Sequence, residues 1–276
     1  MDVSVIIVNY NTLRMTSECI ESVFNETLGL DFEVILVDNA STDGSREHFQ
    51  ADGRIKYVYN GENLGFGKAN NAGLALACGR NVLFLNSDTL LTGNAVKILS
   101  DFLDAHPEAG ACGANLLDRQ GGGNYSFGRR MPGIGHALNT LLHCLPSRLR
   151  YGRDQYFNHT GKPQEVAYIT GADLMVKASV LERAGGFNPE FFMYFEETEL
   201  CWRIKKAGWK IFSVPEASII HLDGASFRTR EQLEARERMV AESRDTYFRL
   251  TGKSPRYAKA VKALSSRTAR RIFLVK

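Results

Sequence analysis

The first hundred residues alternate between unbroken apolar runs and segments whose apolar residues recur at helical spacing. Residues 3–8 and 32–37 are continuous runs rich in β-branched side chains, a pattern typical of strands buried on both faces of a parallel sheet. Between them, residues 13–25 have the spacing of an amphipathic helix, with Thr12 as its cap. The alternation continues with strand, helix, strand and helix over 55–59, 67–78, 81–85 and 94–105. This order predicts a doubly wound α/β sheet flanked by helices.

The second half of the chain has a less regular pattern. Residues 120–132 are rich in glycine and are expected to form a loop, and the long polar stretch 147–164 is a candidate substrate-facing region. The other elements that the pattern predicts are helices over 134–145, 178–184, 197–207 and 229–250, and strands over 166–170, 210–214 and 218–221.

The overall composition is that of a globular protein with a full core. The chain has 276 residues, of which 44% are hydrophobic and 24% charged, which excludes disorder, collagen and coiled coil as descriptions of the whole chain. Its five cysteines are widely spaced without a C-x-x-C motif, so we expect free thiols in a reducing cytosol. The first apolar run is too short for a signal peptide, and no stretch approaches the roughly 18 apolar residues of a membrane span.

The charge is distributed unevenly along the chain. The net charge is +3, but the residues after Gly252 carry eight basic side chains and no acid, which leaves −5 on residues 1–251. An acidic body argues against binding to nucleic acid. In the tail, apolar residues recur at helical spacing among the basic ones: Tyr257, Ala260, Val261 and Leu264. We therefore expect residues 252–276 to lie on an anionic membrane surface, the alternatives being a solvated tail or one that packs on the acidic body.

Polar residues follow the predicted strands, where a doubly wound sheet binds its ligands. Asp38 ends the second strand and could accept hydrogen bonds from a nucleobase or ribose, although Asp is also common in turns and N-caps. Asp88, in LNSDT, could hold Mg²⁺ or Mn²⁺ against a diphosphate, or could simply cap a helix. His221 ends a late strand, and it gains significance only in the company of Asp88.

A glycine-rich segment and an acidic segment are further candidates. Residues 63–73 (NLGFGKANNAG) partly match the dinucleotide pattern G-x-G-x-x-G, but they follow the third strand rather than the first. They could form a tight helix entry, or a helix N-terminus that presents Lys68 to a nucleotide. Glu196, Glu197 and Glu199 begin a helix, where they complement its dipole; crowded charge could also tune one of them as a general base.

These segments together resemble family 2 glycosyltransferases, inverting enzymes with the GT-A fold. The resemblance covers roughly residues 3–226 and is most specific in SVIIVNYN, VDNASTDGS, NLGFGKANNAG, LNSDT and residues 171–211. The branch most similar is the bacterial rhamnosyltransferase-like one, which builds cell-surface polysaccharides. The fold implied is a GT-A type doubly wound mixed sheet flanked by helices.

The resemblance also implies roles for individual residues. Glu197 falls at the catalytic-base position, with Glu196 beside it, and Asp88 and His221 fall at metal positions for Mg²⁺ or Mn²⁺. The donor site would include Asn9, Tyr10, Asp38, Asn63, Gly65, Phe66, Lys68, Asn71, Asn86 and Ser87. Two departures matter, because Asn86 stands where the family's metal motif has its first Asp, and Glu197 where the base is commonly Asp.

The implied activity is sugar transfer from a nucleoside-diphosphate sugar to a glycan or lipid-linked acceptor, in the cytoplasm at the inner face of the cell membrane. Residues 1–228 would form the transferase domain, with a nucleotide-binding half (1–115) and an acceptor half (116–228), and residues 229–276 a helical extension. Two other classes compete: a non-catalytic sugar-nucleotide-binding scaffold, which Asn86 favours, and an NAD-dependent oxidoreductase, which Gly65 and Gly67 favour.

Overall fold

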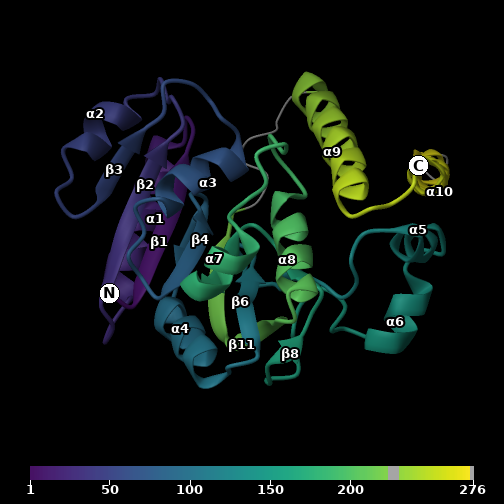
Figure 1. Cartoon of the computed structure of the whole chain (residues 1–276), viewed down its shortest axis with the longest axis horizontal. Coiled ribbons are helices and arrows are strands. Elements are labelled where there is room, and N and C mark those ends of the chain that lie inside the picture. The colour runs from purple at the N-terminus through teal and green to yellow at the C-terminus, as the bar shows by residue number, and fades with distance from the viewer. Residues whose placement is uncertain (223–229, 274–276) are drawn as a thin grey trace.

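The computed structural model describes residues 1–222 and 230–273, and within these the side chains of all but 230, 232 and 265–273. The predicted boundary between residues 228 and 229 lies outside the described residues. Strands and helices alternate along the first part of the chain, and two long helices end it (Figure 1).

The described residues form one nine-stranded mixed sheet and one small two-stranded sheet. The main path runs β3-β2-β1-β4-β10-β6-β11-β5, with β8 paired to β11, and β7 pairs with β9. The strand bounds are β1 Val3–Asn9, β2 Phe32–Asp38, β3 Lys56–Tyr59, β4 Asn81–Asn86, β5 Thr89–Leu91, β6 Ala109–Leu117, β7 Phe127–Gly128, β8 Gln164–Glu165, β9 Tyr168–Ile169, β10 Asp173–Lys177 and β11 Lys210–His221. β1 to β4 are mutually parallel and β10 is antiparallel to both its neighbours, which confirms the mixed sheet.

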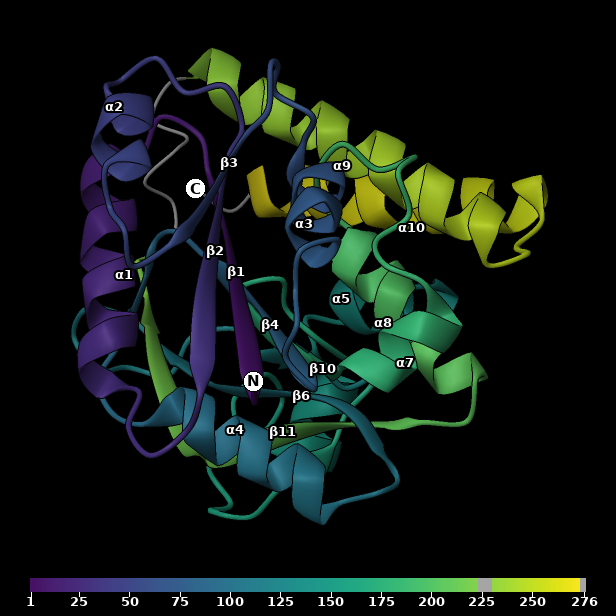
Figure 2. The same cartoon turned by 60° about the vertical axis from the view of Figure 1, so that its left-hand side comes forward.

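Helices cover both faces of this sheet. Their bounds are α1 Leu13–Glu26, α2 Ser45–Gln50, α3 Phe66–Leu74, α4 Ala95–Ala105, α5 Ile134–Leu141, α6 Leu145–Tyr151, α7 Ala178–Ala184, α8 Glu196–Lys206, α9 Arg230–Leu250 and α10 Pro255–Phe273. Figure 2 shows α1 and α4 on one face and α3, α7 and α8 on the other.

The alternation of side chains along the central strands produces these two layers. Val5 and Ile7 of β1 are buried against α1 and α4, whereas Ile6 is buried in the second core beneath α3, α7 and α8. Successive side chains of a strand point to opposite faces, so a strand covered on both sides must be apolar throughout. The unbroken apolar runs thus predicted these strands correctly.

Several elements depart from the sequence-based expectations. The strands β5, β6, β7, β8 and β10 and the helix α2 were not predicted. β6 contains two glycines, Gly110 and Gly113. A Cβ on Gly110 would lie 2.7 Å from Trp209, and one on Gly113 would lie 2.4 Å from Ile169, so these large side chains occupy the space beside the strand. The two strands expected at 210–214 and 218–221 are one strand with a register shift. The stretch 147–164, expected to be a polar loop, overlaps α6.

The C-terminal helices pack on the body through a third apolar cluster. Its buried members, from α5, the loop before α8, α9 and α10, are Ala137, Phe191, Tyr247, Phe248 and Val261. Tyr257 and Leu264 pack against this cluster, and the Ile134 N–H donates to the Tyr257 hydroxyl over 2.8 Å. Three of the four residues of the apolar stripe that was expected to enter a membrane surface, Tyr257, Val261 and Leu264, therefore face the protein, whereas Ala260 is exposed. None of the helices in the described part of the chain is long and apolar enough to cross a membrane.

Candidate active site

The carboxyl ends of the parallel strands meet at one edge of the sheet, as the fold class requires. Asn9 lies opposite Asp38 in the β1–β2 register, and Val8 lies opposite Asn86 in the β1–β4 register. Three of the predicted donor-site residues, from three different strands, are therefore neighbours.

Asn9 holds the loops at this edge together. Its side-chain amide donates to the Ser41 hydroxyl over 2.9 Å, and its carbonyl oxygen accepts hydrogen bonds of 2.8 Å from Thr12 and Thr16. Asn9 is fully buried, whereas the next side chain, Tyr10, is 48% exposed. Of these two predicted donor-site residues, only Tyr10 presents a side-chain surface to a ligand.

Asp38 is equally enclosed. Its side chain is 0% exposed, one carboxylate oxygen accepts from the Ser41 N–H over 2.9 Å, and the other accepts from the Tyr57 hydroxyl over 2.7 Å. Burial and this hydrogen bond raise the pKa of Tyr57, which therefore stays protonated as the donor. Asp38 thus fixes the turn after β2 and the side chain on β3, a role that the sequence did not reveal.

The glycine-rich segment 63–73 packs against the loop before α8. Gly65 has a φ of +80°, and a Cβ there would lie 2.2 Å from the Phe192 carbonyl oxygen, so only glycine fits. The Phe66 N–H donates to the same carbonyl over 2.8 Å, and Asn63 accepts a hydrogen bond of 3.0 Å from the Gly65 N–H. The glycine spacing therefore serves packing, which removes the basis of the oxidoreductase alternative.

Asn71 and Lys68 of α3 differ in what they contact. Asn71 bonds to both backbone groups of Phe187, donating to its carbonyl over 2.7 Å and accepting from its N–H over 2.9 Å. Asn71 is thus a clamp on the loop, whereas the side chain of Lys68 is exposed. Lys68 is the residue of this helix that could reach a ligand.

The two predicted metal ligands lie together. Asp88 Oδ1 is 3.3 Å from His221 Nε2, and the Asn86 side-chain nitrogen is 3.4 Å from the same His221 atom. Both side chains of the pair are partly exposed, and the hydroxyls of Ser87 and Thr12 are 3.3 Å apart beside them.

This donor set fits a hard divalent cation that is shared with a substrate. Among the described residues, no group of three or more His, Cys, Asp or Glu side chains could hold an ion on its own. Mg²⁺ and Mn²⁺ are commonly held by one or two carboxylates with substrate phosphates completing the shell. Asp88 and His221 would be the residues that hold such an ion.

The three glutamates of α8 are in different surroundings. Glu199 is buried and accepts bidentate hydrogen bonds of 2.8 to 2.9 Å from Arg203. Arg203 also donates to the Gly186 carbonyl, just after α7. An ion pair of this kind serves structure. Glu199 is thereby the least suited of the three to take a proton from a substrate.

Glu196 and Glu197 form an adjacent pair of acids, of which Glu196 is buried and Glu197 is partly exposed. Glu196 Oε2 is buried without a hydrogen-bond partner, and burial together with the Glu197 charge raises the pKa of Glu196 well above its ordinary value. Glu197 accepts a hydrogen bond of 2.9 Å from the Thr198 hydroxyl, and burial raises its pKa too. Two neighbouring negative charges repel each other, and the pKa of the more buried Glu196 is raised further than that of Glu197, so Glu197 is the member of the pair that ionises more readily.

The backbone immediately before these acids is strained. Tyr194 and Phe195 have φ values of +72° and +67°, which non-glycine residues rarely adopt. Ser243 of α9 donates to the Met193 carbonyl over 2.7 Å and helps to hold this turn. Strain of this kind is often retained where it positions a functional side chain, here Glu197.

Glu197 opens into a cavity of about 340 Å³ between α5, α8, α9 and α10. Its lining includes Tyr125, Tyr168, His136, Ala137, Tyr194, Phe195, Val240, Phe248 and Val261. The hydroxyls of Tyr125 and Tyr168 are 2.7 Å apart, and the Glu197 charge contributes, after burial, to raising the pKa of both. These two tyrosines were not predicted from the sequence as site residues, because Tyr125 lies in the glycine-rich loop and Tyr168 in an apolar strand.

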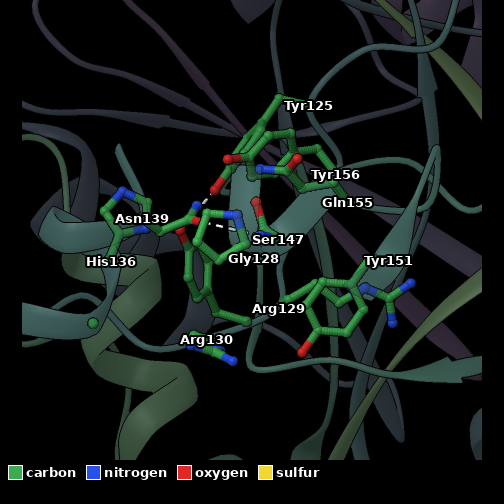
Figure 3. A pocket seen from close by; sticks show the side chains of 13 residues that line it. Tyr125, Gly128, Arg129, Arg130, His136, Asn139, Ser147, Tyr151, Gln155 and Tyr156 are labelled. Carbon is green, nitrogen blue, oxygen red and sulfur yellow. Dashed lines mark hydrogen bonds between the residues drawn. The ribbon is translucent and has the colours of Figure 1, made fainter. Parts of the chain in front are cut away.

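A second, smaller pocket shares Tyr125, His136 and Tyr168 with this cavity (Figure 3). Its other lining residues come mainly from α5, α6 and the segment after β7, and include Arg129, Arg130, Asn139, Tyr151 and Tyr156. Arg129 is bonded to the Asp154 carbonyl over 2.8 to 2.9 Å. The pocket thus combines aromatic walls with two guanidinium groups.

One segment of backbone joins the two halves of the site. The Ala172 carbonyl accepts a hydrogen bond of 2.9 Å from the Asn86 N–H, which fixes the end of β4. At the preceding residue, a Cβ on Gly171 would lie 3.8 Å from the Cβ of Glu197 and 3.6 Å from the Phe66 ring. Gly171 and Ala172 therefore lie next to both the start of α8 at Glu197 and the end of β4, after which the turn with Asp88 follows.

Comparison with known proteins finds a family profile and similar curated proteins. The sequence profile described as glycosyl transferase family 2 matches residues 4–184. An N-acetylglucosaminyl-diphospho-decaprenol L-rhamnosyltransferase of Mycobacterium tuberculosis is 30% identical over 205 residues, which cover 68% of this chain and 66% of that protein, just under two thirds. The low-salt glycan biosynthesis hexosyltransferase Agl10 of Haloferax volcanii is 28% identical over 255 residues, 88% of this chain and 76% of its own.

Solved structures show the same fold. The mannosyltransferase PcManGT of Pyrobaculum calidifontis, in complex with GDP-Man and Mn²⁺, superposes with a TM-score of 0.60 at 19% identity, over 95% of this chain and 68% of its own. TarS of S. aureus gives a TM-score of 0.57 at 21% identity, over 88% of this chain and 40% of its own. These similarities confirm the predicted GT-A fold.

Proposed function

Because this chain belongs to glycosyl transferase family 2, we propose that it is an inverting glycosyltransferase, which moves a sugar from a nucleoside-diphosphate sugar to a hydroxyl group of a glycan or lipid-linked acceptor. The observation that carries this proposal is the Gly171–Ala172 backbone, which lies next to the start of α8 at Glu197 and accepts a hydrogen bond from Asn86 at the end of β4, just before Asp88. A base and a diphosphate-binding group are the two parts that the reaction needs on opposite sides of the anomeric carbon.

The donor would lie across the carboxyl ends of β1, β2 and β4. Tyr10 offers an exposed ring on which a nucleobase can stack, and Lys68 offers a cation near the phosphates. Asp38 would act on the nucleotide indirectly, by holding Tyr57 and the turn at Ser41. Asp88 and His221, with Asn86 beside them, would hold Mg²⁺ or Mn²⁺, which supplies positive charge that stabilises the leaving diphosphate. The neighbour solved with GDP-Man and Mn²⁺ supports this choice of ion.

Glu197 would act as the general base in a single displacement. Its carboxylate takes the proton from the acceptor hydroxyl as the oxygen forms a bond to the anomeric carbon. The bond from that carbon to the diphosphate oxygen breaks, and the nucleoside diphosphate leaves with the electron pair from the opposite face, which inverts the configuration. Burial and the Glu197 charge raise the pKa of Glu196 well above its ordinary value, which favours a negative charge on Glu197 rather than on Glu196.

The acceptor would occupy the cavity at Glu197 and the adjoining pocket. Tyr125 and Tyr168 provide the aromatic surface on which sugar rings commonly pack, and Arg129 and Arg130 suit phosphate groups. The Mycobacterium relative is named for a diphosphate-linked lipid acceptor and for rhamnose transfer, which supports an acceptor and a sugar of these classes here. Such an acceptor would place the protein on the cytoplasmic face of a membrane, and its free cysteines suit that reducing compartment.

Turnover of a panel of nucleoside-diphosphate sugars with Mn²⁺ tests the proposal. We expect one sugar nucleotide of the panel to be turned over with release of its nucleoside diphosphate. Asp88→Ala should lower the rate of this release by at least ~10²-fold if an ion at this site stabilises the transition state by several kcal/mol. Asp101→Ala is a matched control, because that exposed carboxylate on α4 pairs only with Lys97 among the described residues. Binding of a sugar nucleotide without turnover would favour the scaffold alternative, and full activity of Asp88→Ala would contradict the metal site.

A further inference from the structure

The outer surface of α5 and α6 combines exposed leucines with unpaired arginines. The exposed fractions of its leucines are 42% for Leu138, 55% for Leu142, 57% for Leu145 and 79% for Leu149. Among the described residues only three other leucines are comparably exposed, and they are scattered over the molecule. Large apolar side chains gathered on one surface usually mark an interaction site.

The charge of this region has one sign. From Arg119 to Arg153 the chain has six arginines and no acidic residue. Arg130, Arg148, Arg150 and Arg153 are exposed, and in the described part of the chain none of them forms an ion pair. A surface of exposed leucines and arginines is complementary to the interface of an anionic bilayer. The leucines match its apolar interior, and the arginines match its anionic headgroups.

The position of this surface relative to the active site supports the same partner. His136 and Ala137 of α5 line the cavity that contains Glu197, while Leu138 of the same helix is exposed. The α5–α6 pair lies at the side of the molecule away from β1, β2 and β3, next to α10 (Figure 1). Exposed basic residues of α10, among them Arg256 and Lys259, extend the positive charge on that side.

We propose that the α5–α6 surface, defined by Leu138, Leu142, Leu145, Leu149 and the arginines beside them, docks the protein on an anionic membrane. The apolar residues of α10 pack inward, so α10 would add charge but not insertion. This docking rests on the proposed function and extends it, because a lipid-linked acceptor could then enter the Glu197 cavity from the bilayer beside α5. Docking itself is measurable without turnover.

Sedimentation with phosphatidylglycerol vesicles tests this surface. Wild-type protein should pellet with them, less at high salt, and not with phosphatidylcholine vesicles. The double variant Leu145→Glu/Leu149→Glu should lower the partition coefficient by at least ~10-fold, because it replaces apolar side chains with charges that the bilayer repels. Leu28→Glu is the matched control, because Leu28 is 64% exposed and lies between α1 and β2; it should pellet like wild type.

Other results would overturn the inference. One is wild-type protein that stays in solution with phosphatidylglycerol vesicles, and another is a Leu145→Glu/Leu149→Glu variant that still pellets. A third is a loss of pelleting in Arg256→Gln/Lys259→Gln while Leu145→Glu/Leu149→Glu still binds. A dimer in analytical ultracentrifugation that Leu145→Glu/Leu149→Glu dissociates would assign the surface to a second copy instead. Vesicle binding without any sugar transfer would refute only the proposed function, and transfer without vesicle binding only the docking surface.

Discussion

Two adjacent glutamates begin α8, and their surroundings assign them different protonation states. Glu196 has a carboxylate oxygen that is buried without a hydrogen-bond partner among the described residues, whereas Glu197 faces a cavity and accepts a hydrogen bond from Thr198. Glu199 is committed to Arg203. The three residues look equivalent in the sequence, because only burial and partners distinguish a base from a structural acid.

We predict that Glu197→Gln keeps affinity for the sugar nucleotide and loses transfer by ~10²–10⁴-fold, the usual effect of removing a general base. The active form of Glu197 is the carboxylate, and burial raises its pKa. Wild-type turnover should therefore fall as the pH drops through a value above the ordinary pKa of glutamic acid. Initial rates over a pH series, with isothermal titration of the nucleotide, measure both effects.

Glu199→Gln is the control for this prediction, since it should lower the thermal midpoint by breaking the Arg203 pair while an assembled site still turns over. An active Glu197→Gln beside an inactive but folded Glu196→Gln would show that the base is the other member of the pair.

At the scale of elements, the start of α3 and the loop before α8 fit together without spare room. Gly65 approaches Phe192, Asn71 clamps Phe187, and Phe66 bonds to the Phe192 carbonyl. The loop in turn presents Glu196 and Glu197. A helix entry that looks like a nucleotide motif in the sequence thus holds the catalytic helix in place.

Gly65→Ala should lower the free energy of unfolding by ~1–3 kcal/mol or more, because alanine is strained at φ +80° and its Cβ would lie 2.2 Å from a carbonyl oxygen. Turnover should fall together with stability, since the displaced loop carries the base. Gly53→Ala is the control, because its φ is not in the left-handed region and nothing lies within 4 Å of the added Cβ. Urea denaturation compares the two, and equal midpoints would show that the contact relaxes without cost.

At the scale of the whole molecule, the C-terminal helices complete the wall of the cavity that contains Glu197, which we propose as the acceptor site. Val261 of α10 and Phe248 of α9 both line the cavity at Glu197, and Val261 is only 4% exposed. The strands of the nucleotide half lie on the other side of the molecule (Figure 1). Loosening α10 should therefore affect the acceptor more than the donor.

We predict that Val261→Asp detaches α10 from α5, because an unpaired charge buried there costs several kcal/mol. Transfer to an acceptor should fall at least ~10-fold while the nucleotide affinity changes little. Ala260→Asp, at the exposed neighbouring position, should behave like wild type. Limited proteolysis after residue 251 together with nucleotide titration checks the result, and unchanged transfer in Val261→Asp would show that α10 is dispensable for the site.

The sequence by itself determined the parallel strands of the first part of the fold and the polar residues that follow them. Strands covered on both faces must be apolar throughout, so 3–8 and 32–37 were readable as β1 and β2, and Asn86, Asp88 and His221 were readable as polar ends of strands. β6 was not readable, because Gly110 and Gly113 leave its packing to Trp209 and Ile169. Only the tertiary structure enclosed Asp38, turned Val261 inward and separated Glu197 from Glu196 and Glu199. Burial, hydrogen-bond partners and close approach arise between segments distant in the chain, and local patterns do not encode them.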